Sequence, residues 1–133
     1  VKAKAIMEAF VQQYDQIDGV WADSGMLSLP ALEVLKEAGR PLAPSTADQF
    51  NGYAKFVVSN DARGFIYPYP AWQSREAVKY AIKAVQGEEL PKYIKVPVDA
   101  IGPDQIKEYV KMDKPDFWWV GDDQMPEEFL PEL

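Results

Sequence analysis

Hydrophobic residues recur along this chain with two alternating spacings, one typical of helices and one typical of short buried strands. Residues 3–16 place a stripe of apolar side chains on one helical face, formed by Ile6, Met7, Phe10, Val11 and Tyr14. The apolar run Val20–Ala22 then indicates a short buried strand. A second helix is expected with Ser28 as its N-cap and Pro30 in its first turn, and Gly39 ends it.

The same alternation continues through the middle of the chain. A strand is expected near Leu42–Thr46, although Pro44 is unfavourable in a central strand because it has no N–H to donate. Asp48 precedes a further helix, whose apolar positions are Phe50, Tyr53, Ala54 and Val57. Residues 59–63 then form a loop.

The stretch from Gly64 to Gly87 combines a strand, an aromatic turn and a helix. Phe65–Tyr67 has the composition of a buried strand, and two prolines, Pro68 and Pro70, then force an extended turn. The helix that follows runs to Gln86, and Gly87 stands where a left-handed C-cap is wanted. Three large rings lie at or beside the turn: Tyr67, Tyr69 and Trp72. Ligands bind at the carboxyl ends of strands in open α/β sheets, so these rings are candidates for a binding site.

The last third of the chain completes the predicted fold class. Lys92–Val98 has the pattern of an edge strand, and Asp104–Lys111 that of a short helix. From Asp113 onward the chain is an irregular acidic tail that carries Phe117, Trp118, Trp119 and Phe129. Because helices and strands alternate, we expect an α/β fold with a largely parallel, Rossmann-like sheet and flanking helices.

Composition removes several classes of function. The 133 residues include 47% hydrophobic residues, enough for one domain's core, and the formal net charge of −7 provides no basic footprint for nucleic acid. The chain contains no Cys and no His, which excludes thiol nucleophiles, imidazole bases and the commonest metal ligands. It also contains no GxGxxG motif and no P-loop. We therefore expect no cofactor, no metal and no catalysis.

The order of the motifs resembles a known family. GVWADSG, a helix ending KEAGR, TADQFNG and YPYPAWQSREAVKYAIKAVQGEELPK follow one another as in the C-terminal half of a type I periplasmic sugar-binding protein. This is the ribose- and galactose-binding class that serves ABC importers. The resemblance covers nearly the whole chain. It implies two Rossmann-like lobes joined by a hinge that the chain crosses three times, with the sugar held in the cleft between the lobes.

The resemblance also implies a domain organisation. Residues 1–66 would form part of the C-terminal ligand-binding lobe, and residues 67–98 would cross the hinge and return to the N-terminal lobe. Residues 99–133 would make the final crossing and the C-terminal tail. On this interpretation the chain is a piece of a longer protein, completed by the missing N-terminal part or by a second copy. We expect Trp72, Val78, Ile82 or the Trp118-Trp119 pair to be covered by another chain or to be unusually exposed.

Three places match positions at which members of the family contact sugar. The first is Asp23 with Ser24, where the family usually has an Asn-Asp pair. The second is Asp48, which matches an aspartate that accepts hydrogen bonds from sugar hydroxyls. The third is the loop Tyr67–Tyr69, where ribose-type members place a glutamine near Pro68. These departures affect which sugar is bound more than whether a sugar is bound.

The residue types suit a sugar on chemical grounds as well. Carboxylates accept hydroxyl hydrogen bonds strongly, and aromatic faces cover the C–H side of a sugar ring. The candidate ligand-binding residues are Asp23, Ser24, Asp48, Asn51, Tyr67, Tyr69 and Trp72.

Each candidate also has a purely structural interpretation. Asp48 is well placed to be the N-cap of the Gln49–Val58 helix, and Asp23 to be a solvated turn residue. Tyr67 fits a buried strand position, and Trp72 fits the packing of a lobe or hinge. Asn51, which is followed by Gly52, fits a simple helix irregularity.

The function predicted from the sequence is that of an extracytoplasmic solute-binding protein. It would bind a sugar or related polyol and deliver it to an ABC transporter permease. One alternative is the effector-binding domain of a lac-repressor-type transcription regulator. A second is a glycoside-processing enzyme that uses Asp23 and Asp48 as its carboxylate pair. Upstream sequence would separate the first two, since it would show either a signal peptide or a helix-turn-helix.

Overall fold

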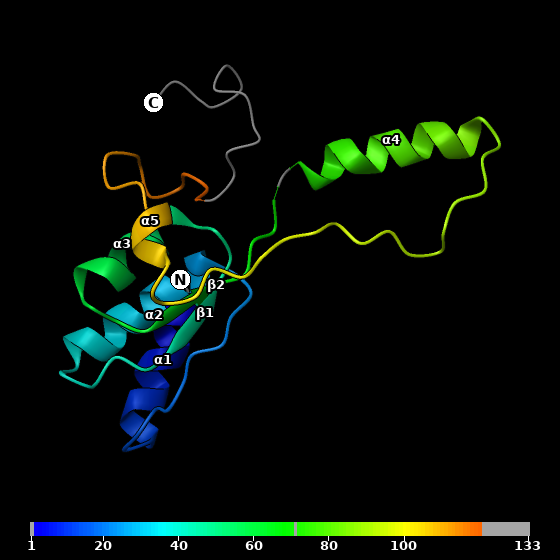
Figure 1. Ribbon diagram of the computed structural model, residues 1–133. Coiled ribbons are helices and arrows are strands. Elements are labelled where there is room, and N and C mark those ends of the chain that lie inside the picture. Colours follow the sequence, from blue (N-terminus) through cyan, green and yellow to red (C-terminus); the bar gives the residue numbers. More distant parts are fainter. Residues whose placement is uncertain (1, 71, 121–133) are drawn as a thin grey trace.

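The computed structural model describes residues 2–70 and 72–120, which form an α/β fold (Figure 1). The elements are, in order, α1 (Lys2–Gln13), α2 (Gly25–Glu37), β1 (Ser45–Ala47), α3 (Asn51–Ser59), β2 (Gly64–Ile66), α4 (Gln73–Val85) and α5 (Ile106–Tyr109). The predicted fold class is confirmed. Phe129 and the other residues beyond 120 lie outside the described part of the chain. None of the described helices has both the length and the apolar character needed to cross a membrane.

The sheet is small and mainly parallel. β1 and β2 pair in parallel, with Ser45 opposite Gly64. Val20 adds a single parallel bridge to Ser45 on one side, and Ile101 pairs with Ile66 in antiparallel fashion on the other. The sheet therefore runs from Val20 through β1 and β2 to Ile101.

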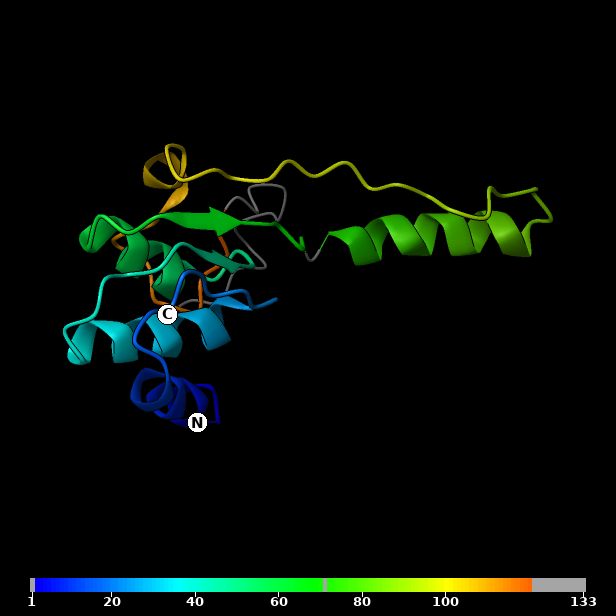
Figure 2. The same ribbon diagram turned by 90° about the horizontal axis from the view of Figure 1, so that it is seen from below.

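Helices α1, α2 and α3 lie together on one side of this sheet (Figure 2). The Tyr53 hydroxyl of α3 donates to the Ser45 carbonyl oxygen at 2.9 Å and lies 2.9 Å from the Ser45 hydroxyl. A Cβ on Gly64 would lie 2.7 Å from the Tyr53 hydroxyl oxygen and 2.9 Å from a methyl carbon of Val57. Only a glycine allows α3 to approach β2 so closely. Burial raises the pKa of the Tyr53 phenol.

The start of α2 differs from the expectation. Ser24, not Ser28, is the N-cap, and its Oγ accepts from the Met26 N–H at 3.3 Å. Ser28 is fully buried inside the helix, where its hydroxyl donates to the Thr46 carbonyl oxygen at 2.5 Å. Pro30 consequently lies within the helix rather than in its first turn. The N-cap prediction was wrong because α2 begins one turn earlier, at Gly25, and the hydroxyl of Ser28 is taken up by its contact with β1.

Two strand predictions also need correction. β1 begins at Ser45, after Pro44, and not at Leu42, which is consistent with the missing N–H of proline. Residues 92–98 form no strand in the described structure. Ile101 makes the edge contact to β2 instead, through two hydrogen bonds with Ile66 of 3.0 and 2.8 Å.

Helix α4 projects away from the rest of the molecule in both views, and the chain beyond it runs back beside it (Figures 1 and 2). None of its described residues is buried, and Val78, Ile82 and Val85 are exposed. Gly87 has a φ of 83°, so the predicted left-handed position at the end of this helix is confirmed. The expectation that Val78 and Ile82 are unusually exposed is met. Trp119 is exposed as well, whereas Trp72 and Trp118 are half-buried.

Candidate functional site

A cavity of about 770 Å³ opens at the carboxyl ends of the strands. Five of the seven predicted site residues line it, namely Asp23, Ser24, Asp48, Tyr67 and Tyr69. Its other lining residues are Trp21, Ala22, Thr46, Ala47, Phe65, Ile66 and Ala100. The structure therefore brings together side chains that are far apart in the sequence, at the edge of the sheet where the fold class places ligands.

Each polar or aromatic group reaches the cavity because it follows a strand position. Asp23 and Ser24 come just after Val20, which pairs with β1, and Asp48 comes directly after β1. Tyr67 comes directly after β2, and its N–H donates to the Ala47 carbonyl oxygen at 2.8 Å. Because parallel strands end at one edge, three successive strand ends supply the lining.

Asp48 has a structural role that the sequence did not identify. Its Oδ1 accepts from the N–H of Gly25, the first residue of α2, at 2.8 Å and from the N–H of Phe50 at 3.3 Å. A carboxylate at the amino end of a helix is favourable, because the free N–H groups there carry partial positive charge. Helix α3 begins at Asn51 with Phe50 as its N-cap, so Asp48 is not the N-cap of this helix. Between residues 2–70 and 72–120 its Oδ2 makes no hydrogen bond.

The two tyrosines present their rings to solvent at the cavity. Tyr67 is 66% exposed and Tyr69 is 75% exposed, so Tyr67 is not a buried strand residue. The backbone at Tyr69 is fixed from the other side, since its N–H donates to Oε1 of the buried Gln49. Rings that are exposed while their backbone is held fixed can cover an apolar ligand face at little entropic cost.

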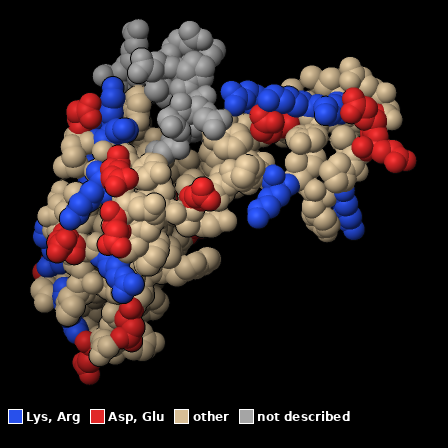
Figure 3. All heavy atoms as spheres, viewed as in Figure 1, with Lys and Arg blue, Asp and Glu red and all other residues tan. Residues whose placement is uncertain are grey.

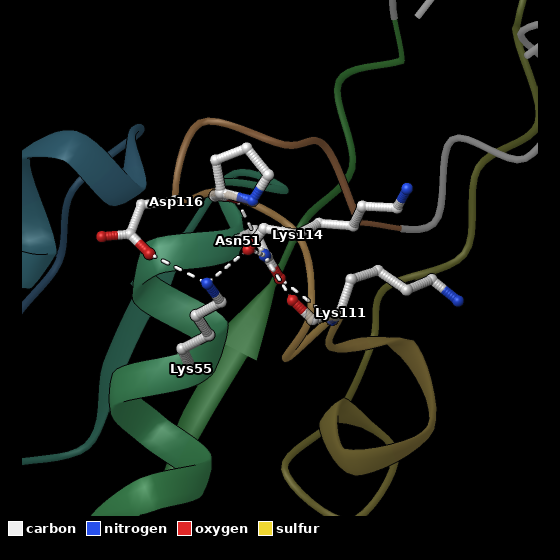
Figure 4. A network of polar contacts seen from close by, with 6 residues as sticks. Asn51, Lys55, Lys111, Lys114 and Asp116 are labelled. Atoms are coloured by element: carbon white, nitrogen blue, oxygen red, sulfur yellow. Dashed lines mark hydrogen bonds and ion pairs between the residues drawn. The ribbon is translucent and has the colours of Figure 1, made fainter. Parts of the chain in front are cut away.

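Asn51 lies outside the cavity. It is fully buried at the start of α3, and its Nδ2 donates to the carbonyl oxygens of Lys111, Lys114 and Pro115 at 2.7, 3.3 and 3.1 Å (Figure 4). Its Oδ1 accepts from the Lys111 N–H at 3.0 Å. Among the described residues, the hydrogen bonds of this amide all go to residues 111–115, so Asn51 is left out of the proposed ligand contacts.

Lys55, one turn further along α3, reinforces this attachment of the C-terminal segment. Its Nζ donates to the Lys114 carbonyl oxygen and lies 3.2 Å from Oδ1 of Asp116 (Figure 4). The backbone carbonyl oxygen of Asp116 also accepts a hydrogen bond from the Gly52 N–H at 2.8 Å. Asn51 and Lys55 thus hold residues 111–116 against the start of α3.

Trp72 lies outside the cavity as well. It is half-buried and immediately precedes α4, on the segment that leaves the body of the molecule. Its predicted role as a ligand-stacking ring therefore gains no support from its position.

Seven lining residues were not predicted from the sequence, and they include Trp21, Thr46 and Phe65. Trp21 was assigned to a buried strand, yet its side chain is 84% exposed. Strict alternation of side chains along a strand would have indicated this, because Val20 and Trp21 point to opposite faces.

Other features of the described residues offer less chemistry. A cavity of about 360 Å³ lies at the opposite ends of the strands, beside Arg40. The Arg40 guanidinium donates there to the carbonyl oxygens of Val11, Tyr14 and Asp15, near the end of α1. Within residues 2–70 and 72–120 no three acidic side chains gather as metal ligands would. Charges of both signs are interspersed over the body of the molecule in Figure 3.

No protein-family model matches the sequence, and no curated protein matches it. Several solved structures do share its fold. A protein from Mycobacterium smegmatis matches with a TM-score of 0.65 at 25% identity, over 80% of this chain and 37% of its own. A structure from the same organism in complex with β-D-fucofuranose matches with a TM-score of 0.67 at 25% identity, over 80% and 36%.

A third match is an ABC transporter solute binding protein from Thermobispora bispora. It has a TM-score of 0.66 at 18% identity, over 87% of this chain and 36% of its own. The chain therefore has the fold of part of a solute-binding protein and spans little more than a third of the length of these structures.

Proposed function

We propose that the protein is an extracytoplasmic solute-binding component of an ABC importer that binds a sugar or related polyol. The observation that carries the proposal is the convergence of two carboxylates and two exposed tyrosine rings on one cavity. Support comes from the shared fold, since one structure of this fold contains a furanose sugar and another is an ABC transporter solute binding protein. The ribose- and galactose-binding class is the subtype that we infer from the sequence motifs.

The chemistry of the cavity fits a neutral, hydroxyl-rich ligand. Oδ2 of Asp48 and the exposed carboxylate of Asp23 accept from hydroxyl groups, and such charge-assisted bonds are stronger than neutral ones. The rings of Tyr67 and Tyr69 cover C–H surface and exclude water. The lining residues include no Lys or Arg, so the described half of the site offers nothing to neutralise an acidic ligand.

We infer further that the ligand is enclosed between two lobes. Residues 1–66 would belong to the C-terminal lobe, residues 67–98 would cross to the N-terminal lobe and back, and residues 99–133 would make the last crossing. Two observations favour this arrangement: α4 makes no extensive contact with another described element, and its apolar side chains are exposed. Binding would then favour the closed state, because only that state lets the ligand touch both lobes. The permease would receive the ligand, and catalysis would play no part.

The proposal is tested first by mass spectrometry of the natural full-length protein purified under native conditions. A bound mass that corresponds to a sugar or polyol is expected, and it identifies the ligand. Recovery of a nucleotide, an amino acid or a peptide in its place would refute the assignment.

Variants then test whether this cavity holds the ligand. Tyr69→Ala should weaken binding of the recovered sugar, since the ring contributes about 25 cal/mol for each Å² of apolar surface that it covers. Tyr14→Ala is the control, because Tyr14 lies just after α1 in the same lobe, is exposed and does not line the cavity. Equal affinities of the two variants in titration calorimetry would show that the sugar binds elsewhere.

A further inference from the structure

Helix α3 begins with an asparagine followed by a glycine, Asn51 and Gly52, a pair of residues that is chemically labile in proteins. The backbone nitrogen of the glycine can attack the side-chain carbonyl carbon of the asparagine, because the glycine has no side chain that hinders the approach. The new C–N bond closes a succinimide ring as ammonia leaves, and water then opens the ring to aspartate or isoaspartate. No other Asn-Gly pair occurs in the 133 residues.

The packing at the start of α3 requires both members of this pair. A Cβ on Gly52 would lie 2.9 Å from the Cβ of Asp116 and 2.7 Å from a ring carbon of Phe50, so glycine is the residue that fits there. Position 51 needs a side chain that donates to several carbonyl oxygens and also accepts an N–H, and a primary amide does both. The contacts that hold residues 111–116 in place therefore also fix the labile pair (Figure 4).

The same contacts block the reaction in the folded protein. The attacking atom is the backbone nitrogen of Gly52, and its N–H donates to the Asp116 carbonyl oxygen at 2.8 Å. The leaving nitrogen is Nδ2 of Asn51, which donates to three carbonyl oxygens, and the whole residue is buried. The helical backbone at the start of α3 also keeps the attacking nitrogen away from the side-chain carbonyl carbon. Attack therefore requires residues 111–116 to move away and the first turn of α3 to unwind.

The product cannot restore these contacts. A carboxylate at position 51 can still accept from the Lys111 N–H, but it has no N–H to donate to the carbonyl oxygens of Lys111, Lys114 and Pro115. A buried carboxylate that faces carbonyl oxygens is unfavourable. The new carboxylate also lies one turn before Lys55 and attracts its Nζ, which in the intact protein contacts the Lys114 carbonyl oxygen and Asp116. Deamidation thus weakens the attachment of residues 111–116 at two points.

We propose that Asn51-Gly52 is a site of spontaneous deamidation, that residues 111–116 keep it unreacted, and that its reaction releases this segment. The step needs no enzyme, cofactor or oxidant, because the Gly52 nitrogen and one water molecule supply the new bonds and ammonia is the leaving group. A molecule whose segment 111–116 opens repeatedly is then converted to a form with an additional negative charge at the start of α3. The inference does not depend on the ligand proposed for the cavity.

Peptide mapping by mass spectrometry of the natural full-length protein, aged in mildly alkaline buffer, measures the reaction. We expect Asn51 to deamidate on the order of 100-fold more slowly in the folded protein than in the same protein unfolded in urea. Lys55→Met removes the Nζ contacts to Lys114 and Asp116, and it should speed the reaction in the folded protein about 10-fold. Lys107→Met removes an exposed lysine of α5 instead, so it serves as the matched control and should leave the rate unchanged.

Hydrogen exchange measures the consequence of the reaction. Asn51→Asp should lower the exchange protection of the Gly52 amide, which donates to the Asp116 carbonyl oxygen, by about 10-fold. If this variant does not fold, deamidated molecules separated from the aged parent protein by ion exchange provide the same measurement.

Three results would overturn the proposal. Equal rates in the folded and the unfolded protein would mean that residues 111–116 do not protect Asn51. No acceleration by Lys55→Met, or equal acceleration by Gly64→Ala, which disturbs the packing of β2 on α3 instead, would mean that release of the segment does not control the reaction. Unchanged protection of the Gly52 amide after Asn51→Asp would mean that the modification does not release the segment.

Discussion

The carboxylate of Asp48 is expected to serve both the fold and the ligand, and two substitutions separate these roles. Asp48→Asn keeps a carbonyl oxygen for the N–H groups of Gly25 and Phe50, which lie 2.8 and 3.3 Å from Oδ1, but it removes the charge. Asp48→Ala removes the acceptor altogether. Hydrogen bonds to charged groups contribute about 1.5–3 kcal/mol, and neutral ones about 0.5–1.5 kcal/mol.

The expected pattern follows from these magnitudes. Asp48→Asn should lose roughly 10- to 150-fold in affinity for the recovered sugar, which corresponds to about 1.5–3 kcal/mol, while the free energy of unfolding falls by only about 1 kcal/mol. Asp48→Ala should lose similar affinity and about 1–3 kcal/mol of stability, because it leaves the Gly25 and Phe50 N–H groups without this acceptor.

Titration calorimetry and urea unfolding of the full-length protein measure the two effects independently. Glu8→Gln removes one carboxylate charge on α1, away from the cavity, and serves as the control for overall charge. If Asp48→Asn binds the sugar as tightly as the parent while Asp48→Ala is destabilised, Asp48 only ties the two loops together. The proposed ligand contact would then be refuted.

Three further predictions concern the packing around the site. Gly64→Ala should destabilise the protein by about 1–3 kcal/mol in urea unfolding, because the new Cβ would lie 2.7 Å from the Tyr53 hydroxyl oxygen. A Cβ on Gly19 would lie 3.7 Å from its nearest neighbour, the Pro44 carbonyl oxygen, so Gly19→Ala should have little effect. An equal loss of stability in the two variants would contradict the packing argument. Burial raises the pKa of Tyr53, so the unfolded state loses this proton first. The contribution of Tyr53 to the free energy of unfolding is complete below pH ~10 and declines as the pH rises toward the pKa of the folded state. Tyr53→Phe should remove this pH dependence from thermal melts. Asn51→Ala should reduce hydrogen-exchange protection of the Lys111 and Gly52 amides yet leave sugar affinity unchanged, and a loss of affinity would return Asn51 to the ligand contacts.

Local sequence patterns were sufficient to predict the fold class and the place of the candidate site. The reason is that the spacing of apolar residues within a short segment distinguishes helices from strands. The alternation of elements predicted a parallel sheet, and the ends of its strands located Asp23, Asp48 and the two tyrosines. The C-cap at Gly87 was likewise predictable, because φ near 83° is a property that glycine tolerates locally.

Contacts between residues far apart in the sequence establish which candidate side chains serve the fold. Asn51 looked like a ligand donor until residues 111–115, some sixty positions away, were found to occupy its amide. Trp21 looked like core, but the register of Val20 with β1 places it on the face opposite α3, where it is 84% exposed. Ser28 looked like a helix cap until its hydroxyl was found to donate to the Thr46 carbonyl oxygen of β1, and Ser24 caps the helix instead. In each case a partner distant in the sequence sets the role of the side chain, and local propensity contains no information about that partner.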